Sequence, residues 1–281
     1  MSQDTVLRAM TNDGAFRVIT ARTTDTVRGA VAAQRGRGMT ARWFGELLTG
    51  AVLFRETMAP PLRVQGIFKG GRTSLVADSH PSGKTRGLIQ QPEGASAADL
   101  GGGARLQMMR TLPDGRLAQG VVEVVPPGGL SRALMAYLQI SEQVESMIAV
   151  GALVDDDRVE SAGGYIVQLL PEARSGPLLL MSERLRDFES IDPLLKSAEF
   201  SSESLLDELL HGMPFTRLDE SPLGFECWCS ELRLIGALST LPRGEIEQFL
   251  KDGKVLEVTC DYCGKEFAVQ PERLRGLLEA S

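Results

Sequence analysis

All four cysteines of this 281-residue chain lie in two short stretches, Phe225-Glu226-Cys227-Trp228-Cys229-Ser230 and Val258-Thr259-Cys260-Asp261-Tyr262-Cys263. One residue separates the first two cysteines, two residues separate the second two, and residues 230–259 lie between the pairs. Paired cysteines supplied by two separate loops are typical of a metal site. Four thiolates can surround Zn²⁺ as a closed tetrahedron that leaves no position for water. The sequence therefore predicts a zinc site made of Cys227, Cys229, Cys260 and Cys263.

The two histidines of the chain do not fit this site. His80 is remote in sequence, and His211 stands ahead of Cys227 without the spacing of a ligand. The pattern therefore favours an all-sulfur site over a mixed Cys/His site or a catalytic Cys/His pair.

The cysteine spacing also permits oxidation. Cys227 and Cys229 can lie at most about 7 Å apart, and a turn can bring Cys260 and Cys263 equally close. A disulfide requires Cα atoms about 4.4–6.8 Å apart, so each pair could be bridged on its own. The site could hold a metal or be doubly oxidised, although a zinc ribbon that only holds a small domain together remains the simplest alternative.

The zinc-bound and doubly oxidised states should differ in fold, because a bound metal stabilises the domain far more than disulfides do. A domain this small buries little core, and metal binding is worth on the order of 10–16 kcal/mol in small zinc folds. A four-residue disulfide loop contributes about 2 kcal/mol, and a bridge across the long gap under about 4 kcal/mol. Oxidation should therefore unfold the domain.

Length and charge narrow the function classes. A chain of 281 residues can bury one large core and still form a small second domain. The net charge of −7 and the lack of a basic stripe argue against nucleic-acid binding. Arg42, Glu46 and Arg55 interrupt the most apolar helix candidate, which argues against a membrane span. The N-terminus lacks a signal-peptide layout and the cysteines are clustered as ligands, so we expect a cytoplasmic protein.

The region before the cysteines predicts an α+β fold with a mostly antiparallel sheet. A strand is expected at 15–21, a helix from Thr24 to Ala33, and a second helix from about Thr40 that stops before Pro60. Residues 62–90 alternate between glycine-containing turns and predict hairpins. Further strands are expected at 105–111, 117–125, 147–154 and 165–170, with a helix from Ser131 towards Gln143. The run Gly101-Gly102-Gly103 has no following Lys-Ser/Thr and is interpreted as a loop.

After Pro171 the composition changes. Residues 182–195 and 202–210 predict short amphipathic helices that Pro193 and Gly212-Met213-Pro214 interrupt. Such helices have little stability of their own and depend on what they pack against. We therefore predict three parts, namely an N-terminal α+β domain at 1–176, a metastable helical linker at 177–222 and a zinc-binding domain at 223–281. An ordinary acidic connector is the alternative reading of the linker.

The cysteine stretches resemble the zinc centre of the heat shock protein 33 family, which are redox-regulated bacterial holdase chaperones. Weaker matches occur in the expected order along nearly the whole chain. Leu7-Arg8-Ala9 with Phe16-Arg17-Val18 resembles the opening strand, Gly45-Glu46-Leu47-Leu48 the first long helix, Arg86-Gly87 a mid-domain turn, Ser141-Glu142-Gln143 a helix end, and Gly163-Gly164-Tyr165-Ile166-Val167-Gln168 the last core strand. Leu88, where the family often has an aromatic residue, and Pro126-Pro127 depart from the pattern.

The resemblance implies a redox cycle and no enzymatic activity. The reduced, zinc-bound form would be inactive, and oxidation would pair Cys227 with Cys229 and Cys260 with Cys263, release the metal and unfold the C-terminal domain and linker. The exposed surface would bind unfolding client proteins. The resemblance also implies a homodimer in the oxidised state and transfer of clients to ATP-dependent chaperones.

Two other functions remain open from the residues. A thiol-disulfide oxidoreductase could use Cys260 and Cys263, since such enzymes place the first cysteine at a helix N-terminus after a strand and a strand is plausible here, but they do not need a second thiol pair nearby. A zinc-ribbon module for transcription or translation would need a basic or stacking surface near the metal. Trp228 and Tyr262 are aromatic there, whereas Glu226 and Asp261 are acidic.

Overall fold

The computed structural model describes residues 3–58, 60–92, 103–124, 129–171, 175–273 and 275. The chain divides into two compact units, residues 1–226 and residues 227–281. Each unit combines helices with antiparallel strands, so the predicted α+β class is confirmed. The predicted linker, 177–222, lies inside the first unit.

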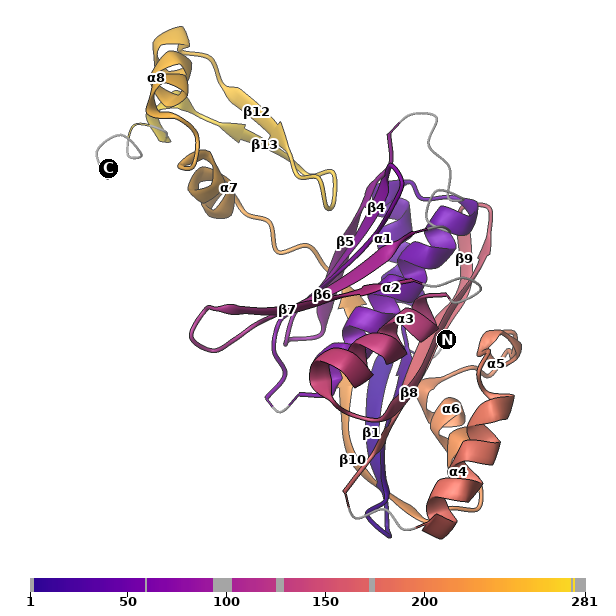
Figure 1. Ribbon diagram of the computed structural model, residues 1–281. Coiled ribbons are helices and arrows are strands. Elements are labelled where there is room, and N and C mark those ends of the chain that lie inside the picture. The colour runs from indigo at the N-terminus through magenta and orange to yellow at the C-terminus, as the bar shows by residue number, and fades with distance from the viewer. Residues whose placement is uncertain are drawn as a thin grey trace. The chain divides into compact units, whose positions relative to one another are not determined.

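Helix α2 (Gly38–Glu56) forms the centre of the first unit (Figure 1). Every residue from Phe44 to Glu56 is buried, because strands of two different sheets pack against this helix. Helix α1 (Thr24–Gln34) precedes it and ends at Arg35, which adopts a left-handed conformation. Both helices were predicted from the sequence and are confirmed.

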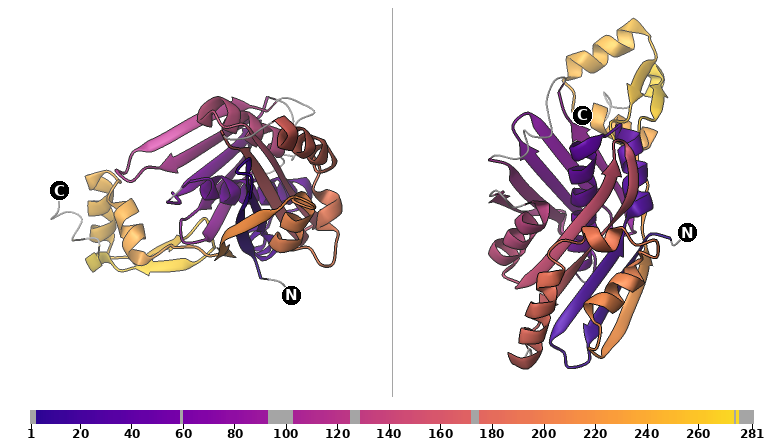
Figure 2. Two further views of the ribbon diagram at one scale, coloured as in Figure 1. Left: turned by 90° about the horizontal axis from the view of Figure 1, so that it is seen from below. Right: turned by 90° about the vertical axis from the view of Figure 1, so that its right-hand side faces the viewer.

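The first sheet is antiparallel and has the strand order β10-β1-β2-β9-β8. Its strands are β1 (Thr5–Thr11), β2 (Phe16–Arg22), β8 (Ser146–Asp155), β9 (Arg158–Leu169) and β10 (Phe215–Pro222). Strand β10 therefore reaches the edge of this sheet from about two hundred residues further along the chain, and both views of Figure 2 show it beside β1.

The second sheet has the order β11-β5-β4-β3-β6-β7. Its strands are β3 (Val64–Gly70), β4 (Thr73–Ser79), β5 (Lys84–Gln90), β6 (Arg105–Thr111), β7 (Leu117–Glu123) and β11 (Gly224–Phe225). The predicted hairpins over 62–90 are confirmed, and β11 adds to β5 in parallel. Helix α3 (Leu130–Tyr137) continues into the π-helical turn η2 (Leu138–Glu142), which ends at Gln143.

Three short helices cover the outer face of the first sheet. They are α4 (Ser175–Asp187), α5 (Asp192–Leu195) and α6 (Ser202–Leu209). Successive residues of a strand point to opposite faces, so Val6 packs towards α2 whereas Leu7 packs towards these helices. The outer face of the sheet supplies Leu7, Ala9, Phe16, Val18, Ala149, Tyr165 and Val167. The helices and the residues next to them supply Met181, Ile191, Leu195, Phe200, Leu205, Leu206, Leu209 and Leu210.

The second unit contains α7 (Glu231–Leu238), α8 (Arg243–Asp252) and a hairpin of β12 (Leu256–Thr259) and β13 (Glu266–Val269). In the sequence, Pro242-Arg243-Gly244-Glu245 followed by Ile246, Phe249 and Leu250 predicts helix α8, and residues 254–258 predict strand β12. Helix α7 and strand β13 were not predicted. Ile246 and Val269 are the buried apolar side chains among the described residues of this unit. Its own hydrophobic core is therefore very small.

One sequence interpretation was wrong. Arg86 and Gly87 lie in the middle of β5 and do not form a turn. A Cβ atom at position 87 would lie 2.4 Å from the carbonyl oxygen of Val76 and 2.5 Å from the Phe44 ring, so the glycine permits the close packing of β5 against β4 and α2. The sequence also predicts a C-terminal helix that contains Leu274, Leu277 and Leu278. These three residues, Gly101-Gly102 and Pro126-Pro127 lie outside the described residues.

Candidate metal centre

The first cysteine pair lies between strand β11 and helix α7. Ser230, the next residue after Cys229, caps that helix by accepting a hydrogen bond from the Arg233 main-chain N–H (3.3 Å). Serine is a favoured residue at this position because its side chain satisfies a free N–H of the first turn. Cys227 and Cys229 are both half-buried. The start of α7 therefore fixes where this loop ends.

The second pair lies in the turn of the β12–β13 hairpin. The Cys260 main-chain N–H donates to the Lys265 carbonyl (2.8 Å), and the N–H groups of Cys263 and Gly264 both donate to the Cys260 carbonyl (3.3 and 2.8 Å). Gly264 has φ of +70°, a conformation that glycine adopts without steric cost. The turn thus holds Cys260 and Cys263 on one closed loop.

The four sulfur atoms converge. Cys227 Sγ lies 3.8 Å from Cys260 Sγ, and Cys229 Sγ lies 3.5 Å from Cys263 Sγ. All four lie within 4.8 Å of one another. Zn–S bonds of about 2.3 Å in a tetrahedron require sulfur separations of about 3.8 Å. The donor set and its spacing fit a zinc ion held by all four cysteines.

The pKa shifts of two of the thiols show how this cluster favours a cation. Burial, the largest cause, and hydrogen bonds with the other three thiols together raise the pKa of the Cys229 thiol to about 12. Burial also raises the pKa of Cys263. Four gathered sulfurs therefore resist becoming anionic by themselves, whereas a bound divalent cation stabilises the thiolates directly.

The structure argues against a dithiol oxidoreductase and against a mixed Cys/His metal site. Residues 260–265 form the hairpin turn, so Cys260 does not have the helix N-terminal position that a dithiol oxidoreductase uses. The His80 ring nitrogen Nδ1 lies 2.8 Å from Ser82 Oγ in the first unit, and His211 lies in the turn after α6. The cluster that the described residues can offer a metal consists of the four cysteines alone.

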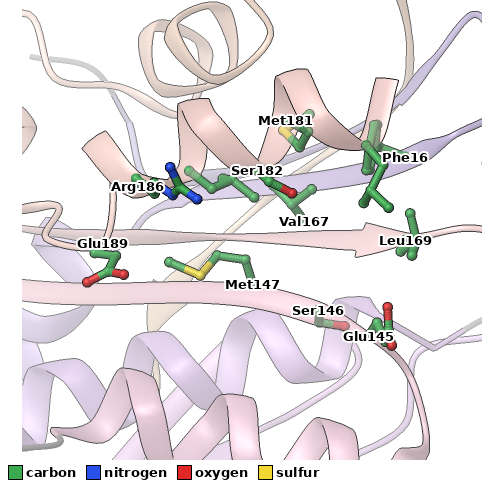
Figure 3. A pocket seen from close by; sticks show the side chains of 12 residues that line it. Phe16, Glu145, Ser146, Met147, Val167, Leu169, Met181, Ser182, Arg186 and Glu189 are labelled. Carbon is green, nitrogen blue, oxygen red and sulfur yellow. The ribbon is translucent and has the colours of Figure 1, made fainter. Parts of the chain in front are cut away.

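A second feature lies where α4 covers the first sheet. A cavity of about 320 Å³ separates the helix from the strands beneath it. Figure 3 shows Met181 and Ser182 of α4 above Met147, Val167 and Leu169 of the sheet, with Arg186 and Glu189 towards one end. The packing of α4 on this apolar face is therefore incomplete, a feature that sequence periodicity could not reveal.

Among the described residues, no helix combines the length and the apolar character that crossing a membrane requires.

Comparisons with known proteins agree along the whole chain. The family model described as "Hsp33 protein" matches residues 4–270. The 33 kDa chaperonin of Desulforamulus reducens is 29% identical over 99% of this chain and 98% of its own length. The 33 kDa chaperonin of Thermus thermophilus is 31% identical over 97% of this chain and 86% of its own length. The crystal structure of the 33 kDa chaperonin of Thermotoga maritima superposes with a TM-score of 0.84 over 99% of both chains, and at 24% identity this likeness supports the fold.

Proposed function

This chain belongs to the Hsp33 family, and from that premise we propose that it is a redox-regulated holdase chaperone whose switch is the four-cysteine cluster. The relatives are named chaperonins and not enzymes. The observation that carries the proposal is the convergence of four sulfurs in a unit that buries so few apolar side chains. Such a unit can lose its fold when it loses its metal.

The reduced state is the inactive one in this proposal. Cys227, Cys229, Cys260 and Cys263 hold Zn²⁺ as thiolates, and metal binding on the order of 10–16 kcal/mol supplies most of the stability of the second unit. The pKa shifts support this, because burial disfavours free thiolates in the absence of a cation.

Oxidation removes the ligands. One hydrogen peroxide molecule takes two electrons from two thiolates, so that one S–S bond forms and the O–O bond breaks, and two protons from solvent complete the two waters that leave. Two such steps convert four thiolates into two disulfides and release the cation, because disulfide sulfur is a poor ligand. The family resemblance favours Cys227–Cys229 and Cys260–Cys263, whereas sulfur distances alone permit either within-pair or cross-pair bridges.

Unfolding of the second unit then frees the linker. The linker segment 177–222 ends at Pro222, and Cys227 follows it closely in sequence. Helices α4, α5 and α6 are short and draw their stability from the sheet face that they cover. Their departure exposes Leu7, Phe16, Val18 and Val167, an apolar surface suited to unfolding proteins.

The remaining parts of the proposal follow from the family. The oxidised form acts as a homodimer in the cytoplasm, holds unfolding clients, and passes them to ATP-dependent chaperones once reduction and zinc return restore the inactive fold. Binding of nucleic acid or membranes has no role in this cycle.

The test measures zinc content and aggregation suppression on one sample before and after peroxide. We expect released zinc and suppression of client aggregation to rise together, and dithiothreitol with zinc to reverse both. Activity that appears while zinc stays bound would contradict the switch. A dithiol turnover assay on the same sample separates a holdase, which turns over no disulfide, from an oxidoreductase.

A further inference from the structure

Strand β10 covers the edge of the first sheet while burying almost none of its own side chains. All eight of its residues are exposed or half-buried, and Leu218 is 52% exposed. Its neighbour β1 is different, because Val6, Leu7 and Ala9 are fully buried or nearly so. The outermost strand therefore contributes little to the apolar core that it adjoins.

The main chain holds the two strands together. The Asn12 N–H donates to the Pro214 carbonyl (2.9 Å), and the Leu223 N–H donates to the Asp4 carbonyl (3.0 Å), at the two ends of the pairing. Main-chain groups of alternate residues face the same neighbour, so Val6, Arg8 and Met10 between these ends also face β10. Their partners in the register are Ser221, Asp219 and Thr216.

Few side chains reinforce this pairing. Arg8 donates to Asp219 (2.7 Å) and to the Ser221 hydroxyl (3.2 Å), and the Thr216 hydroxyl donates to the Asn12 side-chain oxygen (2.9 Å). The Asp219 side chain is 64% exposed, and exposed ion pairs add little to stability. The register also shifts between Arg8 and Ala9, where β10 carries an extra residue. The strand is thus attached mainly by main-chain hydrogen bonds.

The two strands also differ in how they would behave at a sheet edge. Strand β10 ends in Asp219-Glu220-Ser221-Pro222, and charges and proline at an edge prevent pairing with other chains. Strand β1, Thr5-Val6-Leu7-Arg8-Ala9-Met10-Thr11, carries one charge and no proline. Once uncovered, it would be an open template for another strand.

We propose that β10 is a displaceable cover and that, after it leaves, an extended segment of an unfolding client adds to β1 as an antiparallel strand. This inference rests on the proposed function, because linker release is what uncovers the edge. Main-chain hydrogen bonds carry such binding, so it does not depend on the client's sequence. Leu7 and Ala9 belong to the face that α4–α6 cover, so alternate side chains of the client would lie beside newly exposed apolar surface.

Amide hydrogen exchange on the full chain tests this, with reduced, carboxymethylated α-lactalbumin as a client that stays unfolded and has no free thiols. Oxidation alone should expose the amides of Val6, Arg8 and Met10 together with those of β10. Adding client should slow exchange at the three β1 amides by about tenfold or more while β10 stays unprotected.

Four results would overturn the inference. Client that binds without protecting the β1 amides would overturn it alone, as would β10 amides that stay protected throughout. Protection that returns without client and grows with protein concentration would assign the edge to a second copy of this chain. Failure of the oxidised protein to bind client would overturn the proposed function as well.

A competing peptide gives an independent measurement that needs no folded variant. A peptide with the sequence of residues 214–223 should displace the client from the oxidised protein. The same peptide N-methylated at the positions of Thr216, Asp219 and Ser221 keeps its side chains but loses three of the amides that face β1, and it should not compete. Equal competition by both peptides would show that side chains and not strand pairing hold the client, which overturns the inference.

Discussion

Different interactions stabilise each of the two units of this chain. In the first, α2 is buried from Phe44 to Glu56 between two sheets. In the second, Ile246 and Val269 are the buried apolar side chains among the described residues, and four sulfurs lie within 4.8 Å of one another. The hydrophobic effect stabilises the first unit and a bound cation is expected to stabilise the second. In the proposed cycle, a redox signal unfolds the second unit while the first keeps its fold.

The segment from α4 to β10, called the cover below, should be intermediate in stability between the α2 core and the second unit. It belongs to the first unit, yet its apolar side chains are buried only against the outer face of the first sheet. The cavity under α4 and the exposure of β10 show that this cover is incomplete. The comparison predicts graded stability, highest around α2, lower in the cover and dependent on metal in the second unit.

Metal removal should have the largest effect. Stripping zinc from the reduced protein with a chelator removes on the order of 10–16 kcal/mol from the second unit. We expect amide protection around Ile246 and Val269 to be lost while protection in α2 persists, as measured by hydrogen exchange. Replacing Cys227, Cys229, Cys260 and Cys263 with serine should give the same pattern.

Adding zinc back to the chelated wild-type protein is the control, and it should restore protection, whereas the serine variant should not respond. A second unit that stays protected without metal and without thiols would show that its small apolar cluster suffices, and the contrast between the units would disappear.

Matched leucine truncations come next. Leu206 of α6 and Leu48 of α2 are both fully buried, one in the cover and one in the main core. Each change to alanine should cost about 2–5 kcal/mol. Leu206→Ala should loosen the cover, so the reduced, zinc-loaded protein should suppress client aggregation without oxidant. Leu48→Ala should instead lower the unfolding midpoint of the whole first unit.

Leu232→Ala is the surface control, because Leu232 is 80% exposed in α7. It should leave zinc content, stability and activity unchanged. Equal effects of Leu206→Ala and Leu48→Ala on the unfolding of α2 would mean that cover and core unfold as one cooperative unit.

Local sequence signals predicted much of this arrangement. The helix from Thr24, the helix that must stop before Pro60 and the glycine-punctuated hairpins depend on residues close together in the chain, and they are confirmed. The two cysteine pairs were predicted to converge, and the sulfurs do so. Arg86-Gly87 misled because a glycine needed for packing against Phe44 resembles one needed for a turn.

Local sequence signals could not predict which strands pair when they are far apart in the chain. Strand β10 is polar and lacks the alternation of a half-buried strand, so nothing local indicates that it pairs with β1. The division of the strands between two sheets depends on which strands meet across α2, and periodicity carries no such information. Strand β13 and helix α7 are short and were missed for lack of a clear pattern.

A buried carboxylate should make the joint between core and cover sensitive to pH. Arg42 bridges Glu46 of α2 and Asp192 of α5, with N–O distances of 3.0 and 2.8 Å. Burial raises the pKa of Glu46 to about 7, although Arg42 opposes the shift. A raised carboxyl pKa favours the protonated folded form, so its contribution is complete at low pH and is lost as the pH rises through about 7.

Relative to Glu46→Gln, the wild-type protein should therefore lose up to about 3 kcal/mol of unfolding free energy between pH 5 and pH 8. Chemical unfolding of both proteins at the two pH values measures the difference. Because the cysteines titrate alike in both, their contribution cancels. Parallel pH dependence in the two proteins would show that Glu46 is charged throughout and that the joint does not respond to pH.

The smallest expected effect comes from the cap of α6. Ser201 Oγ accepts from the Ser204 N–H (3.0 Å), and Ser204 Oγ accepts from the Ser201 N–H (2.9 Å), a reciprocal pair that satisfies two main-chain donors. Ser201→Ala should cost about 1 kcal/mol, which raises the population of released cover about fivefold. Ser230→Ala makes the same change at α7 and should leave the cover untouched. Equal amide hydrogen exchange rates of α6 in Ser201→Ala and Ser230→Ala would contradict this, and would mean that the stability of the cover does not determine its release.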